Sequence, residues 1–334
     1  MAQRGAKRRR RWFASIPLAL LSVVFLIDSP AQAQSPYWPN GACVQVGAFF
    51  SDSATLAGTE AQVGVNFDQV LKFQPVEDLD LSKLTPFLDA GVRVILNIEF
   101  EADHPDLRDI IAGDYDGYLT AFSHAVAADG RQLWIRPLHE GNGNWYPWGV
   151  FADPTATPSL YIAAFQHVVD VLRAGGGNFK FEFDINQYDG LNKTTPFKDF
   201  YPGDSYVDMN VITTYNRDGT DQYHTTWETF RDNFTNAYTQ VKNMSSRPIG
   251  IAEMSSTSYG GDKVQWITDA FAAIASSDFK RVVEVTWFDE NKTVNGVVWD
   301  WALNTPQEIA AFQAGVAELR TPAVCANRLI MSQS

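Results

Sequence analysis

Several residue types are scarce in this 334-residue chain, and each scarcity excludes a class of protein. Only 2 cysteines are present, too few for a small domain stapled by disulfides. Basic residues number 26 against 39 acidic ones, a balance that argues against nucleic-acid binding, which needs positive charge facing phosphates. With 45% hydrophobic and 13% aromatic residues, the chain is also too apolar to be intrinsically disordered.

Two catalytic motifs are missing as well. No Gly-x-Ser-x-Gly sequence occurs, so the nucleophile elbow of α/β-hydrolases is not indicated. His139 and Glu140 could begin a His-Glu-x-x-His zinc motif, but position 143 is a glycine. The 5 histidines show no ligand spacing, so we expect neither a metal site nor a cofactor.

The first 33 residues differ from the rest of the chain. They hold six basic residues and one acid, then an apolar run over residues 12–27, then Ala31-Gln32-Ala33. This order is typical of a secretory signal peptide, so we interpret residues 1–33 as a signal cleaved after Ala33. A membrane anchor is the alternative, although the run is shorter than the ~20 residues that a span requires. We therefore expect a secreted protein, extracellular or periplasmic, without a membrane segment after cleavage.

Short apolar segments with β propensity alternate with segments of helical periodicity along the remaining chain. The expected strands are residues 43–50, 68–76, 92–100, 132–139, 178–185, 207–215, 248–253 and 281–288. The clearest expected helices are residues 118–128, 159–173, 226–244, 263–275 and 306–319. Eight such alternations predict an α/β protein with a single (β/α)8 TIM barrel over residues 34–334, and a doubly wound open sheet is the alternative.

The expected barrel has consequences for the cysteines and for assembly. The two ends of a closed barrel chain lie near each other, so Cys43 and Cys325 are either bridged or two free thiols. A domain of this size has enough core to be stable alone, so we expect a monomer.

Catalytic side chains of such barrels lie at the carboxyl ends of the strands. Glu99, Glu140, Asp184 and Glu253 lie at or near expected strand ends, and two of them stand out: Glu140, which leads from the fourth strand into a loop rich in aromatic residues, and Glu253, at the end of the seventh. A pair of carboxylates is what hydrolysis of a glycosidic bond requires, and aromatic side chains offer flat faces to sugar rings. Because carboxylates and aromatics are common in loops, position alone leaves the function open.

Four stretches resemble glycoside hydrolase family 26, the β-mannanase family of retaining (β/α)8 glycosidases. RPLHEGNGNWYPWG at 136–149 resembles the acid/base segment, and IIAGDYDGYL at 110–119 resembles the segment leading into the helix before the fourth strand. PIGIAEMSS at 248–256 resembles the nucleophile strand, and VTWFDENK at 285–292, followed by VVWDWAL at 297–303, resembles the eighth strand and its loop. The resemblance implies that residues 34–334 form a secreted retaining endo-β-glycosidase acting on β-1,4-mannan or a related β-glycan. Mixed-linkage β-glucan, xylan or a mannose-containing exopolysaccharide are alternative substrates, and a non-catalytic polysaccharide-binding protein is a further alternative.

The resemblance also implies roles for individual residues. Glu140 is expected to be the general acid/base and Glu253 the nucleophile, with the two carboxyl groups ~5–5.5 Å apart as retention requires. Gly141 departs from the family pattern, which often has methionine there.

Five more residues are expected around the catalytic pair. His139 would contact the sugar and Trp145 would wall the cleavage subsite. Tyr215 would hydrogen-bond the nucleophile and favour its charged form. Trp287 would form the floor under the reacting sugar, and Arg136 would supply a supporting charge.

Overall fold

The computed structural model describes residues 1–2, 38, 42–101 and 106–329. The expected signal peptide and its cleavage position therefore lie almost wholly outside the described residues. Among the residues that the structure describes, no helix combines the length and apolarity needed to cross a bilayer.

Eight parallel strands form a closed barrel in which each pairs with the next and β8 pairs with β1. This confirms the predicted TIM barrel, and each strand overlaps its expected segment. The strands are β1 (Gln45–Phe49), β2 (Gln69–Pro75), β3 (Arg93–Glu99), β4 (Leu133–Pro137), β5 (Phe179–Asn186), β6 (Met209–Asn216), β7 (Ile249–Ser256) and β8 (Val282–Phe288).

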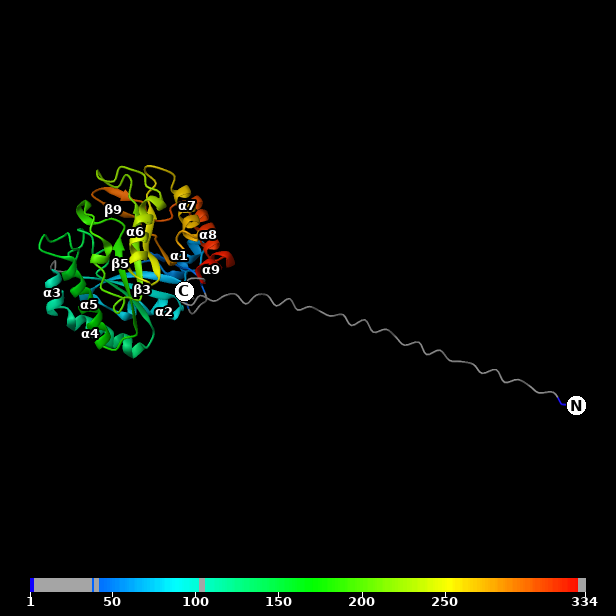
Figure 1. Ribbon diagram of the computed structural model, residues 1–334, viewed down its shortest axis with the longest axis horizontal. Helices are drawn as coiled ribbons and strands as arrows, with labels where there is room; N and C mark the ends of the chain where they lie inside the picture. The colour runs from blue at the N-terminus through cyan, green and yellow to red at the C-terminus, as the bar shows by residue number, and fades with distance from the viewer. Residues whose placement is uncertain (3–37, 39–41, 102–105, 330–334) are drawn as a thin grey trace. The chain divides into compact units, whose positions relative to one another are not determined.

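Helices surround the barrel, and α7 and α8 lie side by side along one flank (Figure 1). The helices are α1 (Leu56–Val63), α2 (Thr85–Asp89), α3 (Leu107–Ala112), α4 (Asp116–Asp129), α5 (Pro158–Ala174), α6 (Phe230–Met244), α7 (Lys263–Ala275), α8 (Pro306–Leu319) and α9 (Pro322–Leu329). The five predicted helices are confirmed. Helix α6 begins four residues later than expected because Thr229 caps it with a reciprocal bond to Asp232.

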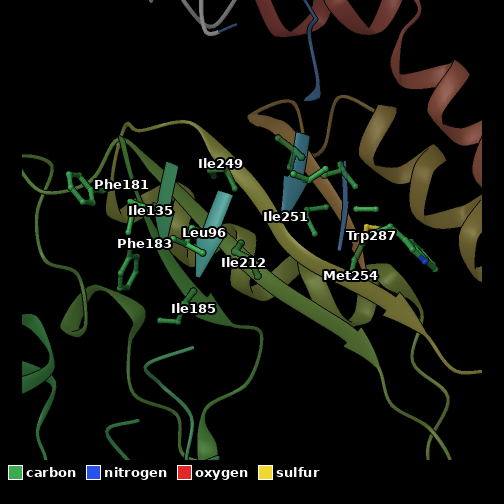
Figure 2. Close-up of a cluster of buried hydrophobic side chains, with 14 of the residues drawn as sticks. Leu96, Ile135, Phe181, Phe183, Ile185, Ile212, Ile249, Ile251, Met254 and Trp287 are labelled. Carbon is green, nitrogen blue, oxygen red and sulfur yellow. The ribbon is translucent and has the colours of Figure 1, made fainter. Parts of the chain in front are cut away.

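The strands alternate between two environments. Outward side chains such as Leu96, Ile135 and Ile212 pack in the hydrophobic layer between barrel and helices (Figure 2). A second apolar cluster, which contains Trp38 and Leu71, lies apart from that layer. The strands also carry buried polar and charged side chains, among them Asn97, Arg136 and Glu182.

Cys43 and Cys325 form a disulfide, with 5.1 Å between their Cα atoms. Cys43 lies just before β1 and Cys325 lies in α9, so the bridge joins the first and last elements of the barrel. Of the two alternatives left open by the sequence, the bridge is the one found. Such a bridge typically stabilises a fold by about 2–4 kcal/mol.

The loop after β8 contains a small antiparallel hairpin, β9 (Lys292–Val294) and β10 (Val297–Trp299), that the sequence patterns did not indicate. Its strands are only three residues long, which is too short for a period-2 pattern to be recognised.

Candidate active site

Glu140 lies in a tight turn directly after β4. Leu138 and Glu140 both have left-handed backbone angles, with φ of 53° and 52°. Non-glycine residues seldom adopt this conformation, which costs of order 1 kcal/mol or more and is found preferentially at functional sites. A Cβ atom on Gly141 would lie 2.0 Å from the ring of Tyr161 on α5, so the departure from the family pattern at 141 makes room for that ring.

Two uncharged donors hold the Glu140 carboxyl group. Trp145 Nε1 donates to one oxygen over 2.7 Å, and Asn186 Nδ2 on β5 donates to the other. Burial, reinforced by the charge of Glu253, raises the pKa of Glu140 to about 7, although these two hydrogen bonds oppose the rise. A carboxyl group with this pKa can both give and take a proton near neutral pH.

Glu253 projects from β7 at an irregularity of the strand. The pairing of β6 with β7 skips Ala252, so Glu253 comes opposite Thr213 on β6. Such a bulge re-aims a side chain toward a site. Tyr215 Oη donates to Glu253 Oε2 over 2.8 Å, as expected, and Asn97 Nδ2 approaches Oε1 at 3.4 Å.

Arg136 supplies positive charge beneath the nucleophile, but its closest partner is another carboxylate. Its guanidinium donates two hydrogen bonds to Glu182 on β5, at 2.9 and 3.1 Å, and Nη1 lies 3.9 Å from Glu253 Oε1. Arg93 and Glu284 complete this buried network. Arg136 therefore acts on Glu253 from within a network of charges, and the sequence did not indicate its partners.

His139 lies in an aromatic cage. Its ring is 4.4 Å from that of Tyr146, 5.3 Å from that of Trp148 and 5.6 Å from that of Phe73. Burial, with the nearby charge of Arg136, lowers the pKa of His139 well below its usual value. Neither ring nitrogen has a hydrogen-bond partner among the described residues, so the neutral imidazole has one donor and one acceptor available.

Trp145 combines a hydrogen bond to Glu140 with an exposed ring. The residue is 42% exposed, and it lines a cavity of about 550 Å³ together with Glu101, Asp106, Asn144, Tyr146, Pro147, Ala152 and Asp153. The expected position of Trp145 beside the acid/base is therefore found, and its ring continues into a space large enough for a ligand.

The expectation for Trp287 is wrong. Its side chain is fully buried on the outer surface of β8, where it packs against Trp266 of α7 and Phe312 of α8. Figure 2 shows it in the hydrophobic layer with Met254, its neighbour on β7. Because successive side chains of a strand alternate between faces, the next residue, Phe288, is the one directed to the inside, where its ring lies 4.5 Å from that of Phe49 and 6.0 Å from that of Tyr215.

Sequence reasoning overlooked several residues of the site. Asn97, Glu182 and Asn186 all lie on β3 or β5 at inward positions, in step with the strand period. That period was the available signal, since alternate residues near a strand's carboxyl end face the barrel axis. Glu99, the last residue of β3, is a further acidic group: burial and the charges of Glu101 and Glu253 raise its pKa to about 7.

Across residues 42–101 and 106–329, no three His, Cys, Asp or Glu side chains are grouped as a metal site would need. What the arrangement can perform is proton transfer at Glu140 combined with nucleophilic or electrostatic action at Glu253.

Two curated proteins are similar in sequence to parts of this chain. A 242-residue stretch is 37% identical to endoglucanase H of Acetivibrio thermocellus, covering 71% of this chain and 26% of that protein. Mannan endo-1,4-beta-mannosidase of Bifidobacterium adolescentis is 29% identical over 126 residues, 34% of this chain and 12% of that protein. The chain therefore spans only about a quarter, or less, of the length of these curated relatives.

The fold has relatives among solved structures. The catalytic domain of the endo-β-1,4-mannanase of Bacillus sp. JAMB-750 superposes with a TM-score of 0.62 at 18% identity, covering 84% of this chain and 87% of that one. Residues 129–247 match the sequence model of glycosyl hydrolase family 26. The match agrees with the resemblance to this family seen in the sequence, and the matched region contains β4, the turn with Glu140, and the side chains of Asn186 and Tyr215 that hold the two carboxyl groups.

Proposed function

We propose that this chain is a retaining endo-β-glycosidase that hydrolyses a β-glycan by double displacement. Glu253 attacks the anomeric carbon while Glu140 gives its proton to the departing glycosidic oxygen, and a covalent glycosyl-enzyme forms. Glu140, now ionised, then takes a proton from water, whose oxygen attacks the anomeric carbon and releases Glu253. No cofactor takes part in either step.

The observation that carries this proposal is the contrast between the two carboxyl groups. Glu140 has a pKa raised to about 7 by burial and by Glu253, as a group that must donate and then accept a proton requires. Glu253 instead accepts a hydrogen bond from Tyr215 Oη and has the guanidinium of Arg136 at 3.9 Å, so a donor and a cation face the carboxylate that would attack. Once Glu253 is glycosylated its charge is gone, so the pKa of Glu140 falls and the general base forms.

The substrate has two candidates. β-1,4-Mannan is favoured by the resemblance of the His139-Glu140 segment to the β-mannanase family and by a relative named as a mannanase. A β-glucan is favoured by the 37% identity to a segment of a protein named endoglucanase H. Both are neutral polymers, in keeping with a net charge of −13, which would repel polyanionic glycans.

A panel of polysaccharides with product sizing tests the proposal. We expect soluble oligosaccharides of several lengths from mannan, mixed-linkage β-glucan or xylan, and NMR of the first product should show the β-anomer. A product with inverted configuration would contradict the double displacement. Binding to the polymers without any release of products would revive the non-catalytic alternative.

We also propose that the protein is exported and acts as a monomer. The Cys43–Cys325 disulfide supports export, because such bridges persist in oxidising compartments. Amino-terminal sequencing of the protein recovered outside the cytoplasm should begin at Gln34, and light scattering should give the mass of one chain. An intact residue 1–33 segment on the exported protein would favour the membrane anchor.

A further inference from the structure

Arg217 and Trp299 form a stacked pair that the proposed reaction does not use. Arg217 follows β6 directly and Trp299 ends β10, so the pair joins two of the loops at the carboxyl ends of the strands. The guanidinium carbon of Arg217 lies 4.9 Å from the centre of the indole ring. Both residues are partly exposed.

Each member of the pair has a buried N–H group without a partner. Arg217 Nε and Trp299 Nε1 make no hydrogen bond to any part of the chain that the structure describes. Leaving a buried donor unsatisfied costs about 1–3 kcal/mol, so two together at the mouth of a barrel indicate that a ligand satisfies them.

The pair is connected to the catalytic residues. Trp299 lies 5.9 Å from Trp301, and Trp301 lies 4.7 Å from Tyr215, the residue that donates to Glu253. The charge of Arg217 acts on Glu140. Through Trp301 and Tyr215, the pair is therefore connected by successive contacts to Glu253, on the side of the barrel where a bound chain of sugars could extend.

The loop that carries Arg217 is fixed in place. Thr220 Oγ1 donates to the carbonyl of Arg217 over 2.7 Å, and Thr257 Oγ1 donates to the carbonyl of Asp218 over 2.6 Å. The second bond ties the loop after β6 to the end of β7.

The loop that carries Trp299 is fixed equally well. Ser258 Oγ donates to the Asp300 carboxylate over 2.6 Å, and the buried Lys263 ammonium donates to the carbonyl of Ala302 over 2.7 Å. Since both loops are held without a ligand, binding at the pair would cost little ordering free energy.

The charges around the pair indicate a neutral ligand. Arg217 faces Asp221 at 3.9 Å, and the charge of Glu140 also acts on it. Glu101 and Glu253 add negative charge near Glu99, and that charge contributes to the raised pKa of Glu99. An anionic sugar would be repelled there, whereas the hydroxyl groups of a neutral sugar can accept hydrogen bonds from both donors.

We propose that Arg217 and Trp299 form a sugar subsite, where oxygens of one residue of a neutral β-glycan accept hydrogen bonds from Arg217 Nε and Trp299 Nε1. This inference rests on the proposed function, whose substrate it helps to hold.

Calorimetry tests the subsite by measuring the Kd of two sugars, mannohexaose and a mixed-linkage β-glucan hexasaccharide. The Glu253→Gln protein is used, because without the nucleophile it should bind these sugars without cleaving them. Adding Trp299→Phe removes one donor and keeps the ring, so we expect Kd to rise about threefold to tenfold. Adding Arg217→Met should raise Kd about tenfold or more, since the lost donor is charged. Arg231→Met is the matched control, because Arg231 also stacks on a ring, that of Phe279, but lies on α6.

Different results test the subsite and the proposed hydrolysis. Unchanged Kd in both Trp299→Phe and Arg217→Met, or an equal rise in Arg231→Met, overturns the subsite. Failure of the unmodified protein to hydrolyse any β-glycan overturns the proposed function, while weaker binding in the two variants still supports the subsite. Absence of binding of both hexasaccharides to the Glu253→Gln protein overturns the subsite for these sugars. In the active protein, Trp299→Phe should raise KM with little change in kcat, as lost uniform binding does.

Discussion

Glu140 and Glu253 have similar burial but are held by different parts of the barrel in different ways. Glu140 is 8% exposed, lies in a turn with left-handed backbone angles, and accepts hydrogen bonds from two uncharged side-chain N–H groups. Glu253 is 7% exposed, lies within a strand, and has a hydroxyl donor and the guanidinium of Arg136 beside it. Burial alone therefore does not set the role of a carboxyl group here.

The contrast shows how one fold obtains an acid and a nucleophile from the same side chain. A group that exchanges its proton needs surroundings that tolerate both states, and uncharged donors meet that need. A group that must stay charged benefits from a permanent cation, and arginine remains protonated at all relevant pH values. The following variants test whether this contrast governs activity.

The largest effect is expected for Glu253→Ala. Removing the nucleophile should lower kcat by about 10⁴-fold or more, because the covalent intermediate cannot form. Added azide should restore turnover and give the inverted glycosyl azide. Near-normal turnover, with folding verified by circular dichroism, would assign the nucleophile elsewhere.

Glu140→Ala should lower kcat on polysaccharide by about 10²–10⁴-fold, the usual contribution of general acid–base catalysis. With an aryl glycoside, whose phenolate leaves without protonation, the rate of the glycosylation step should fall much less. Pre-steady-state release of the phenol measures that step directly. An equal fall in rate on both substrates would show that Glu140 is not the general acid.

Tyr215→Phe should lower kcat/KM by about tenfold to a hundredfold, since a hydrogen bond to a charged group contributes about 1.5–3 kcal/mol. Tyr206→Phe is the control, because its hydroxyl lies 3.4 Å from Asp170 of α5 in the helix layer. An unchanged rate in Tyr215→Phe would show that Arg136 and Asn97 suffice to hold the nucleophile.

The pH profile gives a smaller but directional test. The acid must be protonated, so kcat/KM should fall as pH rises through about 7, the pKa of Glu140. The Trp145 N–H group favours the ionised carboxylate, so Trp145→Phe should raise this pKa and move the basic limb to higher pH. A limb that moves to lower pH would contradict the environment described for Glu140.

The smallest effect on activity is expected for Trp287→Phe. Because Trp287 packs between β8 and the helices, the substitution should reduce the free energy of unfolding by about 0.5–3 kcal/mol, as typical core changes do. KM and kcat should stay unchanged at 25 °C. A raised KM at unchanged stability would restore the floor role that the family resemblance implied.

Much of the fold could be read from the chain because its signals are local. Neighbouring residues alone set the periods of strands and helices and the alternation of these elements. They also set the start of α8 at Thr305 and Pro306. Short elements such as α1 and the β9–β10 hairpin were overlooked, since they expose most of their residues and carry no clear hydrophobic pattern.

The site was predictable only in part. His139, Glu140 and Trp145 share one stretch of sequence, so a motif identifies them together, and Tyr215 and Glu253 end the strands expected from the sequence. Asn97, Glu182 and Asn186 come from other strands and have no motif of their own. The error at Trp287 was one of side-chain direction: a shift of one residue along a strand exchanges the inside of the barrel for the helix layer.

The sequence by itself determined the alternation of strands and helices and the two glutamates near the ends of expected strands, and it favoured a closed barrel over an open sheet. The tertiary structure alone decided which side chains surround them: the amides of Asn97 and Asn186, the charge network of Arg136, the outward direction of Trp287, and the pair of Arg217 with Trp299. The physical reason is that backbone periodicity is set by adjacent residues, whereas hydrogen bonds, desolvation and stacking depend on residues from different strands that only barrel closure brings together.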